Sequence, residues 1–589
     1  MSVDLDRDAP HGNAQFVGST HFAELIKDAK ATSNCEIEDL LQTLESHKGE
    51  WAQLGISERL LLLDEVRKGL WAVKDLWIKS ELSAKGIPAR SSGVAEEWVF
   101  LAQAFRAIRQ IQAALMDIQK QGHPAIPGPV TSGPGGRIVM RVLPQTIWDR
   151  LVFRGVTGDV WMEPGVASED VIEWQAARYR DRDYQGKVAL VLGAGNFATL
   201  PTCDAFHKLF VDLQVVVLKM NPVNAHLGPL MEKALRSLIQ RGFLCIVYGG
   251  ADVGEYLSTH PLVEELHMTG SDKTYEAIVF GTGSEGQRRK LERKPLNTKP
   301  FTAELGNLTP VIVVPGPWKK SDVDEYAKHI ATWLVVNAGF ACFATRTIVQ
   351  HESWPQRTHL TNAIRRELEL YPTRKAYYPG AFKIHSDFLT AHPEALLLGD
   401  ASDDHLPWTM VPDVDPKNTD DICFTREGFV GLCAEVSVEA KSVESYLDRA
   451  VDFVNHTLWG TLCATLIVHP KSLEQPAVAD AIERAIAGLR YGTVAVNMLS
   501  SYGSYFMVCP WGAIPGHDIY DIQSGTGKNF NFLMLHNTEK VVLHAPFRRI
   551  DPLTIRSRRA YVFAEKLATF EASPSWFKLA NLMLAAIAG

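Results

Sequence analysis

Two residues of the chain have the types and surroundings of a covalent catalytic pair. Cys342 lies in the segment NAGFACFATRTIV (337–349), where small residues frame a lone thiol, and Glu304 lies a few dozen residues earlier in AELGNLTPVIVV. A thiol can serve as a nucleophile and a carboxylate as a general base, so the pair is suited to a covalent mechanism. A lone cysteine among apolar residues is more often an inert buried thiol, and spacing alone leaves both interpretations open.

A glycine-rich turn upstream predicts a nucleotide site. The β-branched run KVALVLGAG leads into GAGNFA, which places Gly193, Gly195 and Ala198 in the G-x-G-x-x-[G/A] pattern. The next expected strand ends in Lys219, where dinucleotide-binding proteins usually have an acid. The lysine ammonium group is a hydrogen-bond donor and a cation, so it could bind a ribose hydroxyl or an added phosphate. Asn196, inside the turn, could be a simple turn residue, because asparagine tolerates left-handed backbone.

The elements around these residues predict a doubly wound α/β sheet. The first ~140 residues show apolar residues at three- and four-residue intervals and are expected to be mainly helical. A Pro- and Gly-rich break follows at 123–137. From residue 186 strands and helices alternate, including an amphipathic helix expected over 225–242 with Gly242 at its C-terminal cap. Such sheets bind ligands beyond the carboxyl ends of their strands.

Composition narrows the class of protein. The chain has 589 residues, 46% hydrophobic and 22% charged, with a net charge of −8, so no general affinity for nucleic acid is expected. The polar N-terminus and the lack of a long apolar run predict a cytoplasmic protein without a membrane span. The cysteines show no C-x-x-C and no metal-ligand spacing, so free thiols and no metal are expected. They are Cys35, Cys203, Cys245, Cys342, Cys423, Cys433, Cys463 and Cys509.

Seven segments resemble, in order, motifs of the aldehyde dehydrogenase superfamily. GNFATLP resembles its P-W-N-F-P turn, VVVLKMNP its strand ending in the cofactor-binding lysine, and HMTGS its F-T-G-S turn. AELGNLTPVIV resembles E-L-G-G-K-x-P, and NAGFACFATRTIV the nucleophile segment, with class 3, fatty-aldehyde-like spacing. EGFVGL resembles E-I-F-G-P-V, and YGTVAVN the G-x-x-x-x-N strand. The chain is therefore identified as a divergent member, with the resemblance covering residues 186 to about 545.

The resemblance implies an aldehyde dehydrogenase-like α/β fold with a Rossmann-like cofactor lobe, an α/β catalytic lobe and a small bridging β-sheet. The implied domains are 1–138, a mainly helical part of the cofactor lobe; 139–164, bridging strands; 165–302, the Rossmann-like NAD(P)-binding domain; 303–505, the catalytic domain; 506–548, a return segment and bridging strand; and 549–589, a C-terminal tail.

The resemblance also implies an activity, the oxidation of an aldehyde to a carboxylic acid with NAD or NADP. Cys342 is then the nucleophile, and Asn196 forms an oxyanion hole with the backbone N–H of Cys342. Glu304 is the base that activates water to hydrolyse the thioester. The coenzyme A-acylating branch of the family typically lacks this acid, so Glu304 favours hydrolysis over transfer to a thiol. A reductase that makes aldehydes from acyl-thioesters would leave Glu304 idle.

For the cofactor, the resemblance implies that Lys219 holds the adenosine ribose and Glu427 the nicotinamide ribose. Judged alone, Glu427 could be a surface carboxylate, Phe429 a core ring and Ser271 a helix cap. By the resemblance, Ser271 would instead contact the pyrophosphate of the cofactor near a helix N-terminus. The full set of implied cofactor contacts is Lys219, Gly195, Gly250, Ser271, Glu427 and Phe429.

The chain departs from the family pattern at several positions. Asn307 stands where a second glycine is usual, and Phe340 replaces a glutamine two residues before Cys342. Pro222 replaces an acid that many NAD-preferring members keep, so NADP use is compatible with this position. These changes keep open two rival functions, an acyl-CoA reductase of the same fold and a non-catalytic dinucleotide-binding or scaffold protein.

The expected partners are a small aldehyde, with apolar chains favoured by the nucleophile spacing, and further copies of the chain as a homodimer or homotetramer. The strand in HNTEKVVLHAPF is expected to join RIVMRV and VWMEP in the bridging sheet. The tail combines arginines with WFKLANLMLAAIAG, which predicts a solvated arm and a docked helix, or alternatively a helix on a membrane surface. The tail arginines are Arg548, Arg549, Arg556, Arg558 and Arg559.

Overall fold

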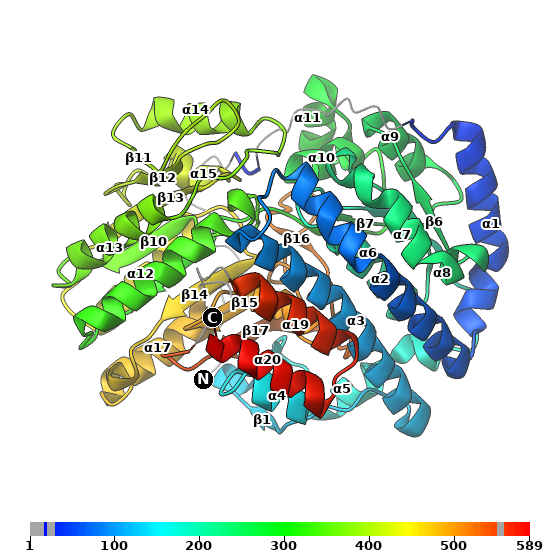
Figure 1. Ribbon diagram of the computed structural model, residues 1–589, viewed down its shortest axis with the longest axis horizontal. Coiled ribbons are helices and arrows are strands. Elements are labelled where there is room, and N and C mark those ends of the chain that lie inside the picture. Colours follow the sequence, from blue (N-terminus) through cyan, green and yellow to red (C-terminus); the bar gives the residue numbers. More distant parts are fainter. Residues whose placement is uncertain (1–16, 20–29, 550–558, 589) are drawn as a thin grey trace.

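The computed structural model describes residues 17–19, 30–549 and 559–588 (Figure 1). The N-terminal part is mainly helical, as the sequence predicts, and consists of three long helices: α1 (Asn34–Gln53), α2 (Ile56–Ala84) and α3 (Ser92–Gln121). Helix α1 begins at Ser33, whose side chain forms a capping box with Glu36. Helix α3 ends at Gly122, which takes the left-handed conformation (φ +87°) that glycine adopts without strain.

A six-stranded sheet follows the predicted alternation of strands and helices. Its five longer strands are parallel, and β4 lies between β5 and β7, so the chain winds outwards from β4 in both directions. Such a switch point creates a crevice at the carboxyl ends of the strands. In spatial order the strands are β16 (Gly525–Thr526), β8 (Phe301–Glu304), β7 (Glu265–Thr269), β4 (Val188–Leu192), β5 (Val215–Lys219) and β6 (Leu244–Val247).

The helix expected over 225–242 is wrong as a single element. The structure has a 3-10 turn at Pro222–Leu227, then α7 (Gly228–Ala234) and α8 (Arg236–Gln240), separated by the non-helical backbone of Leu235. Helix α2 approaches this break closely, because a Cβ added to Gly69 would lie 2.3 Å from the carbonyl oxygen of Ala234. Gly242 does follow the end of α8 with a φ of +72°, as expected for a residue just past a helix.

The second sheet has eleven strands and includes those expected to bridge. Strand β17 pairs in parallel with β15 and antiparallel with β3, so the bridging strands extend the catalytic sheet within one chain. In spatial order the strands are β1 (Val130–Ser132), β2 (Ile138–Leu143), β3 (Thr157–Met162), β17 (Thr538–His544), β15 (Thr493–Val496), β14 (Cys463–Ile467), β9 (Pro310–Val313), β10 (Thr347–His351), β13 (Leu432–Val438), β12 (Trp408–Val411) and β11 (Leu396–Leu398).

The first of the two C-terminal helices lies beside α3 in Figure 1, and the second packs on the first. Helix α19 (Ala560–Ala572) is fixed there by a buried ion cluster, in which Arg106 of α3 contacts Asp149 at 2.7 Å and Glu571 at 3.0 Å. Because each charge in the cluster has an opposite partner, the burial is tolerated. Arg556 and Arg558 lie outside the described residues.

Helix α20 (Trp576–Ala588) docks through Leu579 and Leu582, which are buried. The opposite stripe of the helix is apolar and exposed, with Trp576 at 65%, Phe577 at 77% and Ile587 at 83% of full exposure. Among the described residues, no helix is both long and apolar enough to cross a membrane.

Candidate functional site

The loop before Cys342 has an unusual backbone. Asn337, Ala338 and Gly339 all take positive φ values, +50°, +57° and +83°, directly after α12 (Lys320–Val335). Gly339 has no room for a side chain, because a Cβ would lie 2.4 Å from the backbone nitrogen of Gly431. Such strained backbone persists only where surrounding structure holds it, and it is concentrated at functional sites.

Arg346 holds this loop in place. Its guanidinium group donates to the carbonyl oxygens of Gly339 (2.6 Å) and Ala341 (3.3 Å) on one side. On the other side it donates to the carbonyl oxygens of Val430 and Leu432, next to β13. The rigid five-donor fork of arginine can join several acceptors at once, so Arg346 fixes the loop that carries Cys342 against the eleven-stranded sheet.

Cys342 and Glu304 meet at the end of β8. The Sγ atom of Cys342 donates a hydrogen bond of 3.3 Å to Oε1 of Glu304, and both side chains are buried. Burial raises the pKa of Glu304 from 4.5 to about 7. It also raises the pKa of the Cys342 thiol well above 9.0, an effect that the Glu304 carboxylate reinforces. The pair therefore has a thiol and a carboxyl group placed for proton transfer between them.

Asn196 reaches the same loop from the turn after β4. Its side-chain amide donates to the carbonyl oxygen of Phe340 at 3.0 Å, two residues before Cys342. Asn337 in turn donates to the backbone carbonyl of Asn196 at 2.9 Å, and so does the Tyr377 hydroxyl at 3.1 Å. Asn196 is thus held against the loop that carries Cys342 by contacts with Phe340, Asn337 and Tyr377.

A cavity of about 410 Å³ occupies the crevice at the switch point. The first turns of two helices line it, those of α9 (Ala251–Thr259) at Gly250 and α10 (Asp272–Phe280) at Ser271. Ser271 is also the helix cap of α10, because its Oγ accepts from the N–H of Thr274 at 3.1 Å. The structure brings all of the predicted site residues to this cavity: Cys342, Glu304, Asn196, Lys219, Gly195, Gly250, Ser271, Glu427 and Phe429.

The donors and acceptors of this cavity fit a nicotinamide dinucleotide. Two helix N-termini offer N–H groups to phosphates, and Lys219, at the end of β5, offers an ammonium group to ribose hydroxyls. At the other end Glu427 offers a carboxylate, and it is buried, not on the surface. A Cβ on Gly306 would lie 2.2 Å from Oε2 of Glu427, so glycine keeps the cavity open at that carboxylate.

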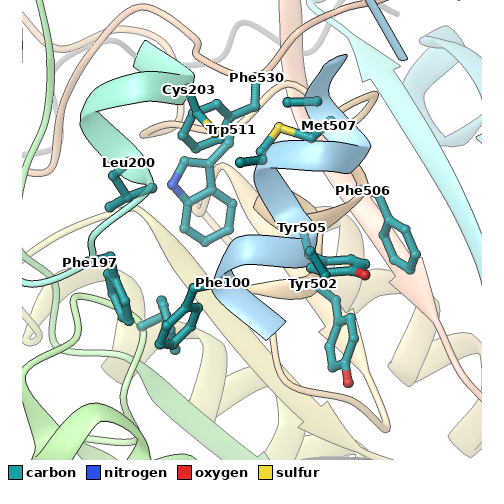
Figure 2. Packing of buried hydrophobic residues seen from close by; sticks show 14 of the residues in the cluster. Phe100, Phe197, Leu200, Cys203, Tyr502, Tyr505, Phe506, Met507, Trp511 and Phe530 are labelled. Atoms are coloured by element: carbon teal, nitrogen blue, oxygen red, sulfur yellow. The ribbon is translucent and has the colours of Figure 1, made fainter. Parts of the chain in front are cut away.

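A second, narrow pocket of about 50 Å³ opens on the other side of Cys342. Its lining comes largely from α3, α6 (Leu200–Phe210), α18 (Tyr502–Phe506) and the return segment, and nearly half of the lining residues are aromatic. Figure 2 shows several of these side chains, among them Phe100, Phe197 and Trp511. The rings of Phe100 and Phe197 pack edge to face at 4.5 Å, and Phe197 stacks on Phe343 at 5.6 Å. Among the described residues, Glu304 and Cys342 are the only two that line both cavities.

Sequence reasoning missed several residues of the site. The sequence around Arg346 shows no motif that indicates its role, apart from its position four residues after Cys342. Glu255 and Ser19, which were also not predicted, line the larger cavity. Ser19 belongs to the N-terminal segment and is 285 residues from Glu304 in the chain. No pattern within a short window could have placed it there.

One group of potential metal ligands comes together outside this site, although the sequence lacks metal-ligand spacing. Atoms of His392, Asp421 and Cys423 lie within 4.8 Å of one another. Both ring nitrogens of His392 are engaged by carboxylates, Nδ1 with Glu394 at 2.8 Å and Nε2 with Asp421 at 3.0 Å. These contacts account for the cluster as hydrogen-bonded side chains.

A model of the aldehyde dehydrogenase family matches residues 200–371. Aminoaldehyde dehydrogenase 1 of Pisum sativum is 25% identical over 345 residues, which are 56% of this chain and 58% of that protein. Betaine aldehyde dehydrogenase 1 of Oryza sativa is 28% identical over 172 residues, 29% of this chain and 28% of its own. The chain thus spans well under two thirds of the length of these relatives.

Solved structures share the fold over a greater length. GapN, a glyceraldehyde-3-phosphate dehydrogenase of Methanocaldococcus jannaschii, aligns with a TM-score of 0.58 and 15% identity, covering 89% of this chain and 97% of its own. Aldehyde dehydrogenase 21 of Physcomitrella patens aligns with a TM-score of 0.58 and 16% identity, covering 90% and 95%. The matched segment contains both Glu304 and Cys342. Residues 200–371 are thus similar to the aldehyde dehydrogenase family, and the fold as a whole is similar to that of these solved structures.

Proposed function

We propose that this protein oxidises an aldehyde to a carboxylic acid with NAD or NADP as the hydride acceptor. The observation that carries the proposal is the position of Cys342 and Glu304, 3.3 Å apart where the two cavities meet. A thiol at that point can be reached by a carbonyl compound from one side and by a dinucleotide from the other. Structures of relatives such as GapN are described as complexes with NADP, which agrees with the donor set of the larger cavity.

The chain's own residues supply the covalent steps. Cys342 loses its proton to Glu304, and its sulfur forms a bond to the aldehyde carbon, which makes a thiohemiacetal. The amide of Asn196 and the backbone N–H of Cys342 stabilise the charge on the carbonyl oxygen. A bound nicotinamide dinucleotide supplies the two-electron oxidation that leaves a thioester. Glu304 releases the proton of Cys342 to solvent and, as a carboxylate again, takes a proton from water, whose oxygen bonds to the acyl carbon. The bond to sulfur breaks, and the leaving Cys342 thiolate can take that proton back from Glu304.

The smaller pocket supports an apolar aldehyde. Apart from Glu304, no described residue of its lining carries a charge at neutral pH, and the Phe100, Phe197 and Trp511 rings form much of its wall. The names of the relatives from pea and rice refer to aldehydes with an amino or ammonium group. We propose that this chain instead prefers uncharged aliphatic or aromatic aldehydes, because an apolar wall offers a charged substrate little compensation for lost hydration.

Glu304 also bears on the two rival functions. An acyl-CoA reductase would release or accept the acyl group through a thiol and would not need a base for water beside Cys342. A scaffold protein would need neither residue. The buried carboxyl group at 3.3 Å from the thiol, with a pKa of about 7, supports hydrolysis as the second half of the reaction.

The test is aldehyde-dependent reduction of NAD and of NADP, followed by absorbance, for the wild type and two variants. We expect Cys342→Ala to abolish turnover and Glu304→Gln to give a burst of reduced cofactor with little steady rate. Cys433→Ala, a buried cysteine on β13, is the matched control and should keep activity. Full turnover in Cys342→Ala would refute the mechanism. Acyl-CoA-dependent oxidation of NADH or NADPH, unchanged in Glu304→Gln, would favour the reductase.

A further inference from the structure

Residues 17–19, here called the N-terminal strap, join two parts of the candidate cofactor cavity. The N–H groups of Val17 and Gly18 both donate to the carbonyl oxygen of Thr425, at 2.8 and 2.9 Å. The N–H of Glu427 donates back to the carbonyl oxygen of Gly18 at 3.0 Å. The strap therefore pairs with the segment that carries Glu427, in the manner of a short parallel strand.

The other end of the strap is anchored at the first turn of α10. The N–H of Ser19 donates a hydrogen bond of 2.9 Å to Oδ1 of Asp272, which is buried. Gly18 makes this contact possible, because it has a φ of +76° and a Cβ at this position would lie 2.1 Å from Oδ2 of Asp272. Only glycine fits both the left-handed backbone and the close approach. Four hydrogen bonds thus fix the strap between the Glu427 segment and the N-terminus of α10.

Ser19 brings a hydroxyl group into the cavity. It is 1% exposed and lines the cavity of about 410 Å³. A Cβ on Gly306 would lie 2.8 Å from Oγ of Ser19 and 2.2 Å from Oε2 of Glu427, so the two oxygens flank the same glycine. No hydrogen bond of the Ser19 hydroxyl to the described residues has good geometry, although the hydroxyl lies near enough to the Asp272 carboxylate to oppose the rise in its pKa that burial causes. A buried hydroxyl of this kind ordinarily has a partner, and here a ligand of the cavity would provide one.

We propose that the N-terminal strap is part of the dinucleotide site and that the Ser19 hydroxyl binds a ribose hydroxyl of the dinucleotide beside Glu427. The proposal rests on the proposed function, since it assumes that the larger cavity takes NAD or NADP. Glu427 can only accept hydrogen bonds when ionised, whereas Ser19 can donate or accept. The two side chains together can therefore satisfy a pair of adjacent ribose hydroxyls, and Gly18 positions the strap for this contact.

Binding of NADH or NADPH to the full-length chain tests the proposal without turnover. Titration by calorimetry or by enhanced nicotinamide fluorescence should give a Kd three- to tenfold higher for Ser19→Ala than for the wild type. Gly18→Val, which cannot make the turn, should weaken binding at least tenfold. Ser46→Ala, a serine on the exposed face of α1 whose hydroxyl donates within its own helix, is the matched control and should bind as the wild type does.

Kinetics and hydrogen exchange separate a binding role from a structural one. We expect Ser19→Ala to raise KM for the dinucleotide while kcat at saturation changes less than twofold, and the N–H groups of Gly18 and Ser19 to exchange more slowly with dinucleotide bound. Wild-type Kd in both Ser19→Ala and Gly18→Val would overturn the proposal and leave the proposed function intact. A wild-type chain that binds neither dinucleotide would overturn both. Thermal unfolding of each variant identifies any that fail to fold.

Discussion

The backbone N–H of Asn307 donates a hydrogen bond of 3.2 Å to Oε1 of Glu427. Asn307 lies three residues after Glu304, so this hydrogen bond joins the segment that carries Glu304 to the side chain of Glu427. Asn307 itself is held by its side chain, which donates to Thr309 Oγ1 and to the carbonyl oxygen of Cys463, both at 2.9 Å. The residue that departs from the family's glycine thus joins β8, β14 and the Glu427 segment.

Stability should fall as the pH rises through the range in which Glu304 ionises. Burial raises its pKa from 4.5 to about 7, so between these values the folded chain binds more protons than the unfolded chain. The stabilisation is present below pH 4.5 and is lost as the pH rises to 7. Glu304→Gln should therefore unfold at the same temperature as wild type near pH 5 but at a higher temperature at pH 8.

The size of this effect follows from the shift in pKa. One pKa unit corresponds to about 1.4 kcal/mol, so the difference at pH 8 should be on the order of 1 to 3 kcal/mol. Thermal unfolding at the two pH values measures it, with Glu50→Gln on α1 as an exposed control that should show no such difference. An equal effect of Glu304→Gln at both pH values would mean that ionisation is not its cause.

Loss of the Arg346 fork should reduce both stability and activity. Arg346→Lys leaves some of the carbonyl oxygens of Gly339, Ala341, Val430 and Leu432 without a donor, and each buried unsatisfied group costs about 1 to 3 kcal/mol. We expect a lower unfolding temperature, a kcat at least tenfold lower and altered labelling of Cys342 by a thiol reagent. Arg366→Lys, on an exposed face of α13 (Arg357–Leu370), is the control. A less stable variant with normal turnover and labelling would limit Arg346 to a structural role.

The aromatic pocket should make apolar aldehydes the better substrates. In a panel of hexanal, benzaldehyde, betaine aldehyde and succinic semialdehyde, we expect kcat/KM to be at least tenfold higher for the first two. Phe100→Ala removes one wall and should favour longer chains, because the pocket is only about 50 Å³. Phe382→Ala, an exposed ring on α14 (Ala381–Ala391), is the control. A preference for either charged aldehyde would contradict the proposed substrate class.

Contact of the tail with a membrane surface remains a prediction, and α20 gives it a specific form. The apolar stripe with Phe577 and Ile587 is exposed, and Trp576 packs on Trp148 of α4 (Ile147–Val152), where Arg150 is also exposed. Exposed aromatic and aliphatic side chains beside cations are typical of helices that lie on anionic lipid. We expect the chain to sediment with phosphatidylserine-containing vesicles more than with phosphatidylcholine vesicles, and less at high salt.

Variants of α20 and of an unrelated exposed site test whether the apolar stripe causes the sedimentation. Phe577→Asp combined with Ile587→Asp should abolish sedimentation, whereas Leu291→Asp, on an equally exposed site of α11 (Gly283–Leu291), should not. The contrary result is a wild type that fails to sediment with either kind of vesicle, together with a double variant that forms a smaller oligomer than the wild type in solution. That result would mean that the stripe is a contact between copies of the chain. The homodimer or homotetramer expected from the sequence would then gain an interface.

The sequence was informative where function depends on residues next to strand ends. Gly195, Lys219 and Ser271 each follow or end a strand of the six-stranded sheet. The alternation of strands and helices predicted the sheet, and the resemblance to family motifs predicted that these three residues share one site. Cys342 and Glu304 could be paired only through the order of the motifs. Their separation of 3.3 Å and the raised pKa of the acid depend on burial, which no spacing reveals.

Other features depend on contacts between distant segments. The aromatic pocket uses Phe100 of α3, in a region that the sequence assigned only as helical, and Ser19 is fixed by Asp272, 253 residues away. The expected helix over 225–242 is broken at Leu235, where α2 packs closely. Local periodicity described residues 225–242 as amphipathic, but the packing partner determined the final geometry.

Strand β17 has a consequence for how the chain is made. It lies between β3 and β15, so the central part of the eleven-stranded sheet is joined only when residues 538–544 insert between strands that begin at 157 and 493. During synthesis from the N-terminus, β3 and β15 both have an unpaired edge until almost the whole chain has been translated. Unpaired edges favour aggregation. A ribosome-bound or truncated chain that ends before residue 538 should therefore depend on chaperones far more than one that ends after 548.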